Sequence, residues 1–328
     1  MGGFSKYTNN NGTVAAVPKS IAVLIPTFRR PEMLQALLVS LSEGTRVPDE
    51  VIVVDNDPER SAYPEPIAGL PVRVHHAGLG LSLAGARNAG WRAADAELCI
   101  FIDDDNVVER DAIAQLARPF EAPGTGLAAP VIFAGDSGTI WCGGIRRSEW
   151  TGLTRCLFRG QSLLPASTAS WPTDDTPDAF AIPRAVLERV KGFDDERFPI
   201  HYDEADLGAR IRGLGLQTIV IRDARVRHYG WVGISSGHAI VRATASHGVD
   251  RGRQMALSRV RFHMLHSRGL QRLSSVTIFI PIWTFVTMAA CLRAEASWAV
   301  RTTAVRAVAG GIFAGYREGL DRWRSAHR

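Results

Sequence analysis

The sequence lacks the short motifs that mark several common protein classes. No GxxxxGKS or GxxxxGKT stretch is present, which argues against a P-loop enzyme. The first 20 residues contain no apolar h-region, so we expect a flexible tail at residues 1–20 and no secretory signal. No CxxC pair occurs, so a disulfide framework or a zinc site is not expected and a reducing cytoplasm fits. The four cysteines are scattered: Cys99, Cys142, Cys156 and Cys291.

Composition indicates a folded chain with a basic end. The chain has 328 residues, of which 46% are hydrophobic and 22% charged, which is typical of a globular protein with a full core. The net charge is +5, with Lys and Arg concentrated in the last third and acidic clusters in the middle. This asymmetry favours an anionic partner such as phosphate, acidic lipid or nucleic acid. No recognisable nucleic-acid-binding module is present, so we expect no nucleic acid partner.

Short apolar runs alternate with helical patterns in the first hundred residues. Runs at 21–25, 51–54, 72–74 and 98–102 predict strands, and helices are expected after Pro31 and from Ser82 to Arg92. Continuous apolar strands alternating with helices indicate an α/β fold whose mostly parallel sheet is flanked by helices. The segment from Pro119 to Asp178 lacks a clear pattern, and we expect it to be irregular. Strands at 179–182 and 217–221 and helices after Pro183 and near residue 203 follow.

Three consecutive carboxylates, Asp103, Asp104 and Asp105, directly follow the apolar run 98–102. Three acids at the end of a buried strand repel one another, and burying them unpaired is costly. Such hard oxygen ligands suit Mg²⁺ or Mn²⁺ bridging a phosphorylated substrate. The alternative is a solvated acidic turn in which Asp105 and Asn106 cap the next helix.

Other polar residues also stand at predicted strand ends. Thr27 follows the first strand, and Asp55 and Asp57 follow the second. Because ligands of parallel sheets bind beyond the carboxyl ends of the strands, we expect these residues and the aspartate triplet to share one crevice. Arg87, on the helix that Ser82 opens, could reach a pyrophosphate there or could face water.

A second acidic cluster, Asp203-Glu204-Ala205-Asp206, opens a predicted helix. Acids in a first helical turn are favoured by the helix dipole, but three exceed what capping requires, and a carboxylate facing a cleft can act as a general base. His228 follows the last predicted strand. It is either a third metal ligand beside the aspartates or an ordinary satisfied histidine.

Seven short motifs follow one another along the chain, each weak alone. They are Pro26-Thr27-x-Arg29, Asp55 with Asp57, Gly85-Ala86-Arg87-Asn88-Ala89-Gly90, Ile102-Asp103-Asp104-Asp105, Gly192-Phe193-Asp194, Asp203-Glu204-x-Asp206-Leu207 and His228. In this order they resemble an inverting family-2 glycosyltransferase of GT-A fold over about Ile21 to Trp231. The aspartate triplet, the DEAD sequence and the RHYGW sequence resemble the galactofuranosyl- and rhamnosyl-transferase branches.

The resemblance implies a role for each matching residue. Asp55 reads the nucleotide base, Asp103 contacts the ribose or the metal, Asp105 binds the cation and His228 completes the metal shell. The remaining donor-side residues are Pro26, Thr27, Arg29, Asp57, Arg87 and Asp104.

The resemblance also assigns the base and the acceptor side. The second residue of the acidic motif is the usual base, which is Glu204. The order Asp-Glu departs from the commoner Glu-Asp or Asp-Asp, so Asp203 remains an alternative. Asp206 and Trp231 are expected on the acceptor side.

The function implied is transfer of a hexosyl or deoxyhexosyl group, dependent on Mn²⁺ or Mg²⁺ and inverting at the anomeric carbon. The donor would be a UDP- or dTDP-sugar, and the acceptor a hydroxyl of a glycan or polyprenyl-linked glycan in cell-envelope polysaccharide synthesis. A nucleotidyltransferase or a non-catalytic sugar-binding scaffold of the same fold are the alternatives.

The last third predicts a separate helical region. We expect the transferase domain at residues 21–235 and a basic helical region at 236–328. Residues 274–292 carry no charge and lie between Arg272 and Arg293. This stretch is long enough to span a bilayer, but Pro281 and several Ser and Thr residues equally suit an interfacial or buried helix. We expect a cytoplasmic protein, peripheral at the inner face of the membrane or with a single C-terminal span.

Overall fold

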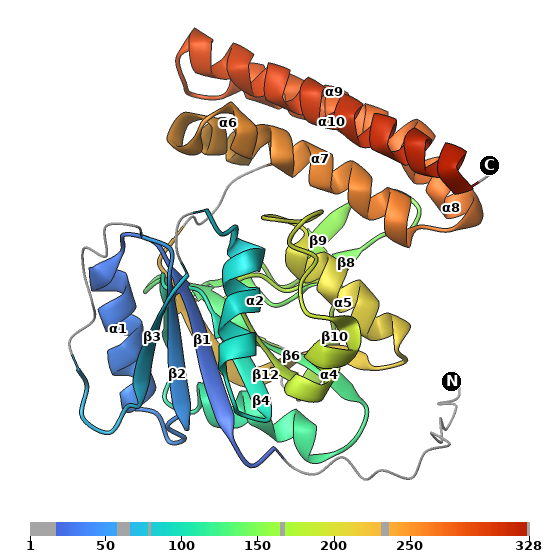
Figure 1. The fold of residues 1–328 in the computed structure, drawn as a ribbon. Helices are drawn as coiled ribbons and strands as arrows, with labels where there is room; N and C mark the ends of the chain where they lie inside the picture. Colours follow the sequence, from blue (N-terminus) through green and yellow to red (C-terminus); the bar gives the residue numbers. More distant parts are fainter. Residues whose placement is uncertain (1–17, 58–65, 78–79, 165–167, 231–235, 327–328) are drawn as a thin grey trace.

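The computed structural model describes residues 18–57, 66–77, 80–164, 168–230 and 236–326, and begins with alternating strands and helices (Figure 1). The order is β1 (Ile21–Thr27), α1 (Pro31–Ser42), β2 (Glu50–Asp55), β3 (Val72–His76), α2 (Leu83–Ala93) and β4 (Leu98–Ile102). β1 pairs in parallel with β2 and β4, and β2 pairs in parallel with β3. The parallel sheet expected from the apolar runs is confirmed in this half.

The second half continues the same sheet with mixed strand directions. Its elements are β5 (Asn106–Val108), α3 (Ala112–Ala117), η1 (Arg118–Glu121), β6 (Thr125–Ala134), β7 (Ile140–Cys142), β8 (Ile145–Arg147), β9 (Thr154–Cys156), β10 (Ser170–Pro172), β11 (Ala179–Pro183), α4 (Arg184–Val190), α5 (Asp203–Gly213) and β12 (Gln217–His228). The strands follow the order β10-β12-β6-β11-β4-β1-β2-β3. β11 runs antiparallel to both β4 and β6.

The expectation that Pro119 to Asp178 is irregular was wrong for its first part. β6 has ten residues and lies inside the sheet between β11 and β12. Gly126 and Pro130 interrupt its apolar pattern, and both residue types are unfavourable in strand interiors, which is why the pattern did not indicate a strand. Packing on both faces overrides that local preference.

The sheet is buried on both faces. Because β1, β2, β3 and β4 run in parallel, their carboxyl ends lie at a common edge of the sheet. Alternate residues of β1 point to opposite sides: Ile21, Val23 and Ile25 join a core with α1 and α3, whereas Ala22 and Leu24 join a core with α2, α4 and α5. Both cores consist of side chains almost fully removed from water.

The C-terminal region is a set of helices with its own core. It comprises α6 (Ser236–His247), α7 (Val249–His266), α8 (Gly269–Ser274), the π-helix η2 (Ser275–Phe279), α9 (Ile280–Arg293) and α10 (Trp298–Ala326). Figure 1 shows these helices as a layer stacked beside one end of the sheet domain, with α10 running along α7. Phe262 of α7 packs against Phe198 and Ala205, so this layer is docked on the sheet domain beside α5. The boundary expected at residues 235 and 236 stays a prediction, because residues 231–235 lie outside the described part of the chain.

Candidate active site

The carboxyl ends of three adjacent strands are joined by hydrogen bonds. Thr27 ends β1, is the register partner of Asp55 at the end of β2, and donates from its hydroxyl to Asp104 Oδ2 at 2.7 Å. Arg30 Nη1 donates to Asp104 Oδ1 at 3.1 Å and to Asp105 Oδ2 at 3.0 Å. These strand-end residues therefore lie together, and Asp104 is held by protein groups.

A second set of contacts lies at the ends of β1, β2 and β3. The backbone N–H of Asp57 donates to Asp55 Oδ1 at 2.8 Å, and Arg29 Nε lies 3.1 Å from Asp57 Oδ1. His76 Nδ1 lies 3.6 Å from Asp55 Oδ2. Pro26 pairs in register with Val54. These residues therefore lie together at the ends of β1, β2 and β3, and their roles toward a nucleotide stay a prediction.

Arg87 lies at the centre of the acidic residues rather than at the surface. Its side chain is 0% exposed, and it donates to Asp103 Oδ1 at 2.8 Å, to Asp203 Oδ2 at 2.6 Å and to Glu204 Oε1 at 2.6 Å. Ser82 caps the helix that carries it, accepting from the N–H of Gly85 at 3.0 Å. The suggestion that Arg87 reaches a pyrophosphate is thus not supported by its position, because its donors are turned to three carboxylates. It joins two motifs that are 100 residues apart.

The three acids around Arg87 differ in ionisation. Burial raises the pKa of Asp103 to about 6, against the opposing effect of Arg87. Burial and the neighbouring Glu204 raise the pKa of Asp203 well above its usual range. Burial also opposes ionisation of Glu204, but the charge of Arg87 and a hydrogen bond from Asp203 outweigh it, and the pKa of Glu204 is lowered. In this pair Asp203 holds the proton and Glu204 carries the negative charge at neutral pH.

His228 lies between two further carboxylates. Its Nδ1 is 3.4 Å from Asp105 Oδ1 and 3.4 Å from Asp178 Oδ2, and its ring stacks on Trp141 with a centroid separation of 4.5 Å. Asp178 Oδ2 and His228 Nδ1 are buried without a well-formed hydrogen bond. A Cβ at Gly230 would lie 2.5 Å from Asp105 Oδ2, so only glycine fits beside this cluster. Burial and the charges of Asp103 and Asp105 raise the pKa of Asp178 well above its usual range.

The chemistry of this cluster suits a hard divalent cation. Two carboxylates and an imidazole are ligands that Mn²⁺ and Mg²⁺ sites use, and their orphaned atoms are what a cation would satisfy. The described residues contain no ready-made group of three His, Cys, Asp or Glu ligands, and Asp105 is shared with Arg30. Binding of a cation would therefore require these side chains to rearrange. Asp103, expected as a ligand, is held by Arg87 on the other side of the triplet.

A cavity of about 410 Å³ opens beside Asp103, Asp178, Asp203 and Glu204. Its opposite wall comes from the C-terminal helices, which contribute residues such as Arg251, Arg259 and Trp283. The wall combines apolar and cationic side chains. The remaining lining residues are Leu83, Ile145, Arg147, Thr154, Asp175, Pro177, Ile200, His201, Tyr202, Ile240 and Met255.

The two residues expected on the acceptor side have different outcomes. Asp206 is 2% exposed and does not line this cavity: it is held by Arg210 Nη2 at 2.6 Å and by His266 Nε2 at 2.8 Å. Its observed contacts tie α5 to α7, because it lies two residues after Glu204, where about 200° of helix rotation turns its side chain to another face of α5. Trp231 lies outside the described residues.

The sequence did not indicate a place in the site for Asp178, for Asp175 or for the arginines that line the cavity. These arginines are Arg147, Arg251 and Arg259. Asp178 directly precedes β11, and the antiparallel pairing of Ala179 with Ile102 brings it beside Asp103. An acid next to a five-residue apolar run was the available indication, but Asp178 precedes its strand, whereas ligands of parallel sheets are expected at the carboxyl ends. Asp175 pairs with Arg147 at 3.0 Å, and its burial raises its pKa to about 6.

Comparison with solved structures identifies the fold of the protein. The fold is similar to that of a mannosyltransferase, PcManGT of Pyrobaculum calidifontis, in complex with GDP-Man and Mn²⁺, with 15% identity, a TM-score of 0.54 and coverage of 94% of this chain and 91% of that one. It is also similar to GalNAc-T7 with UDP, GalNAc and Mn²⁺, with 17% identity, a TM-score of 0.53 and coverage of 78% and 54%. The expected GT-A fold is confirmed.

The family is shown by sequence. The model described as "Glycosyl transferase family 2" matches residues 22–191, and the chain belongs to that family and is a glycosyltransferase. Galactofuranosyltransferase GlfT1 of Mycobacterium tuberculosis is 28% identical over 275 residues, which cover 78% of this chain and 85% of GlfT1. The O-antigen biosynthesis protein RfbC of Myxococcus xanthus is 27% identical over 232 residues, which cover 66% of this chain but only 18% of RfbC.

Proposed function

We propose that the protein is a metal-dependent, inverting glycosyltransferase that moves a sugar from a nucleoside diphosphate to an acceptor hydroxyl. One observation carries the proposal: Arg87 gathers Asp103, Asp203 and Glu204 into a single cluster on the wall of the cavity. This arrangement sets a prospective base next to the strand end where a donor diphosphate would lie.

Glu204 is the proposed base. It is ionised because Arg87 and Asp203 lower its pKa, and its side chain retains 15% exposure on the cavity, whereas Asp203 is 1% exposed. As the acceptor oxygen attacks the anomeric carbon, Glu204 takes the hydroxyl proton and the bond to the diphosphate breaks on the opposite face. One in-line displacement inverts the anomeric centre, and base catalysis contributes typically ~10²- to 10⁴-fold.

The donor is proposed to lie along the strand ends. Asp55 and Asp57 would meet the base of the nucleotide, and Asp103 its ribose, consistent with their places at the ends of β2 and β4. Asp105, His228 and the additional carboxylate Asp178 would hold the cation. When bound there, Mn²⁺ or Mg²⁺ would supply positive charge to the departing diphosphate.

The substrate class is proposed from the relatives. Two relatives are named as a galactofuranosyltransferase and an O-antigen biosynthesis protein, which supports a role in making cell-envelope polysaccharide. We propose a UDP- or dTDP-linked hexose or deoxyhexose as donor, and a glycan, carried on a polyprenyl lipid, as acceptor. The apolar cavity residues Met255, Ile240 and Trp283 are compatible with an acceptor that includes an apolar portion.

The experiment that tests this function is calorimetric titration of full-length protein with UDP-, dTDP- and GDP-sugars, each with Mn²⁺ and with EDTA. We expect at least one UDP- or dTDP-sugar to bind with Mn²⁺ and to bind at least ~10-fold more weakly with EDTA, because the diphosphate loses its counter-charge. Failure of every nucleotide sugar to bind in the presence of Mn²⁺ would contradict the proposed function.

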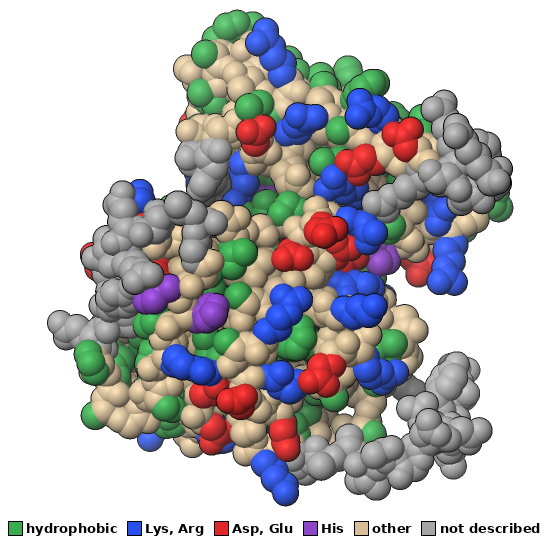
Figure 2. Space-filling model, in the orientation of Figure 1, with side chains coloured by type: hydrophobic (Ala, Val, Ile, Leu, Met, Phe, Trp, Pro, Cys, Tyr) green, Lys and Arg blue, Asp and Glu red, His purple; other side chains and the backbone are tan. Residues whose placement is uncertain are grey.

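We also propose that the C-terminal helices rest on a membrane surface. Gly269–Arg293 is 25 residues long with a mean hydropathy of 1.9 in its most apolar window, and only 22% of that window is buried. Figure 2 shows hydrophobic and basic side chains, with a few acidic ones, on the visible face of the C-terminal helices. The exposed apolar residues recur at helical spacing and form one face: Leu270, Leu273, Ile278, Ile282, Phe285, Val286 and Leu292. An apolar face flanked by arginines suits an interfacial helix on anionic lipid.

Flotation with anionic vesicles tests this location. We expect wild-type protein to float, and high salt to weaken flotation without abolishing it, because apolar contacts are screened little. Phe285→Asp, at a side chain that is 75% exposed, should reduce flotation strongly, whereas Leu163→Asp on the transferase domain, 83% exposed, should not. Wild-type protein that remains lipid-free and soluble without detergent would argue against membrane binding.

A further inference from the structure

Three arginines line the cavity, and two of them are held by the protein. Arg147 Nη2 lies 3.0 Å from Asp175 Oδ2, and its guanidinium stacks on Tyr202 and Phe262 at 4.8 and 4.6 Å. Arg259 donates to the Tyr202 hydroxyl at 3.2 Å and to the carbonyl oxygen of Gly152 at 3.0 Å, and lies 4.3 Å over the ring of Trp283. These contacts hold both side chains between α7 and the transferase domain, although Nε and Nη1 of Arg147 and Nε of Arg259 are buried without a hydrogen-bond partner.

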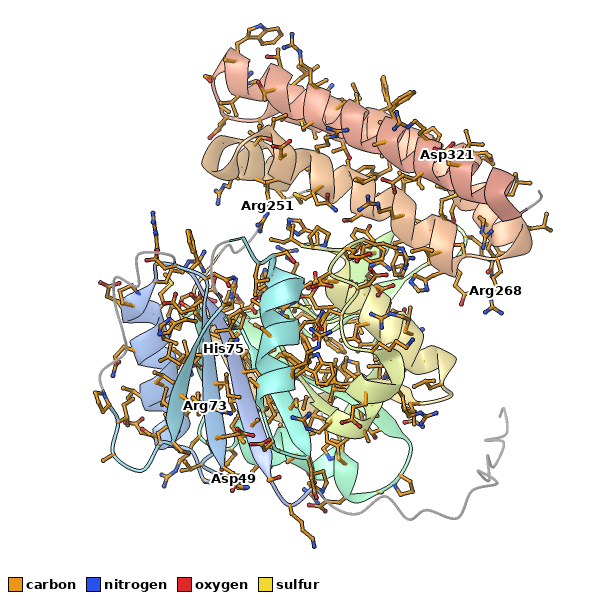
Figure 3. All side chains as sticks on the ribbon, in the orientation of Figure 1. Asp49, Arg73, His75, Arg251, Arg268 and Asp321 are labelled. Atoms are coloured by element: carbon orange, nitrogen blue, oxygen red, sulfur yellow. The ribbon has the colours of Figure 1, made fainter. Side chains whose placement is uncertain are left out.

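Arg251 differs from both. It stands in the first turn of α7, lines the cavity and is partly buried, yet within the described ranges no hydrogen bond or ion pair joins it to another residue. Figure 3 shows it projecting from α7 toward the transferase domain. Its guanidinium is half-buried at the cavity wall and makes no bond to a protein acceptor within the described ranges, so its N–H donors are available to an anion that enters the cavity.

The surroundings of Arg251 identify the part of the site that it faces. Burial is the largest influence on its pKa and lowers it, Asp203 raises it and Arg30 lowers it, so Asp203 and Arg30 lie close enough to Arg251 to affect its ionisation. Asp203 belongs to the base cluster, and Arg30 binds Asp104 and Asp105 at the strand ends. Asp203 itself is turned to Arg87 and is 1% exposed, which leaves Arg251 free to take an anion from the cavity.

We propose that Arg251 binds a phosphate group of the substrate and that α7 thereby completes the active site. Guanidinium groups bind phosphate through two parallel N–H···O bonds, and phosphate is the anion that a nucleotide-sugar reaction brings to this cavity. This inference rests on the proposed function. Two sources share the chemistry: the diphosphate of the donor, and a phosphate on a lipid-linked acceptor.

The test uses full-length Arg251→Ala and Arg251→Lys variants, with Arg253→Ala as the matched control. Arg253 lies two residues further along α7, is exposed and does not line the cavity. Calorimetric titrations in Mn²⁺ use three probes: UDP or dTDP, whichever wild type binds more tightly; the nucleoside alone; and farnesyl diphosphate. Thermal melting verifies that each variant is folded.

A donor role predicts that Arg251→Ala weakens the nucleoside diphosphate about 10- to 100-fold while leaving the nucleoside unchanged. An acceptor role predicts the same loss for farnesyl diphosphate alone. Arg251→Lys should recover part of either loss, because a lysine keeps the charge but not the two parallel bonds. Arg253→Ala should match wild type throughout.

Unchanged affinity of Arg251→Ala for both phosphate probes would overturn the assignment while the proposed function stands. Wild-type protein that binds no nucleoside diphosphate and no nucleotide sugar with Mn²⁺ would overturn the proposed function as well. An equal loss in Arg253→Ala would also overturn the assignment, because it would show a general effect of positive charge on α7.

Discussion

Glu204→Gln is expected to lower turnover by at least ~10²-fold with donor affinity little changed. Glutamine has nearly the same shape as glutamate, so it keeps the place beside Arg87, but it cannot accept the acceptor proton. The measurement is steady-state transfer with the donor identified by calorimetry, together with a titration of that donor into the variant.

Asp203→Asn is the comparison that assigns the base. Asp203 is buried and holds the proton of the pair, so an asparagine amide can donate to Glu204 in its place, and the loss of turnover should be smaller. If Asp203→Asn had the larger effect, the base would be Asp203 and the pairing of roles would be reversed. Equal and small effects of both variants would remove the base from this motif altogether.

Asp105→Ala is expected to abolish transfer and greatly weaken cation-dependent nucleotide binding, while the fold survives. Asp105 lies between Arg30 and His228 at the end of β4, and no other residue of the triplet approaches His228 as a carboxylate partner within the described structure. The measurement is titration of a nucleoside diphosphate at several Mn²⁺ concentrations, with thermal melting to verify folding.

Glu109→Ala is the matched control for the metal prediction. Glu109 lies four residues further along the chain and makes a partly exposed ion pair with Arg227 at 3.1 Å, away from the cavity. It should leave the Mn²⁺ dependence unchanged. If Asp105→Ala bound nucleotide with the same Mn²⁺ dependence as wild type, Asp105 would not be a ligand of the cation.

The first half of the fold was predictable because its interactions are local or periodic. Buried parallel strands appear as continuous apolar runs, as in Leu98–Ile102, and Pro31 and Ser82 mark helix starts. Because ligands of parallel sheets bind beyond the carboxyl ends of the strands, the sequence also predicted that Thr27, Asp55 and Asp104 lie together. In the structure Thr27 is the register partner of Asp55 and donates a hydrogen bond to Asp104. The ten residues of β6 escaped prediction because Gly126 and Pro130 weaken the local pattern and only neighbouring strands stabilise it.

Local sequence patterns did not indicate which way side chains point or which residues they contact, because these depend on residues distant in the chain. Asp178 enters the cluster around His228 because β11 runs antiparallel to β4, and no local pattern states the direction of a strand. Arg87 became a buried bridge because α5 sets Asp203 and Glu204 against α2, which excludes water from a residue that is usually exposed.

The sequence by itself determined the family, the α/β class and the positions of the acidic motifs, since these follow from periodicity and from residues adjacent in the chain. Only the tertiary structure decided what those residues face. Packing of α7 on Phe198 and Ala205 closes a cavity over Glu204 and brings Arg251 to it, whereas the sequence indicated only a basic helical region beside a membrane. The physical reason is that burial and charge pairing are properties of surfaces that meet in space, and helix spacing alone does not specify which surfaces meet.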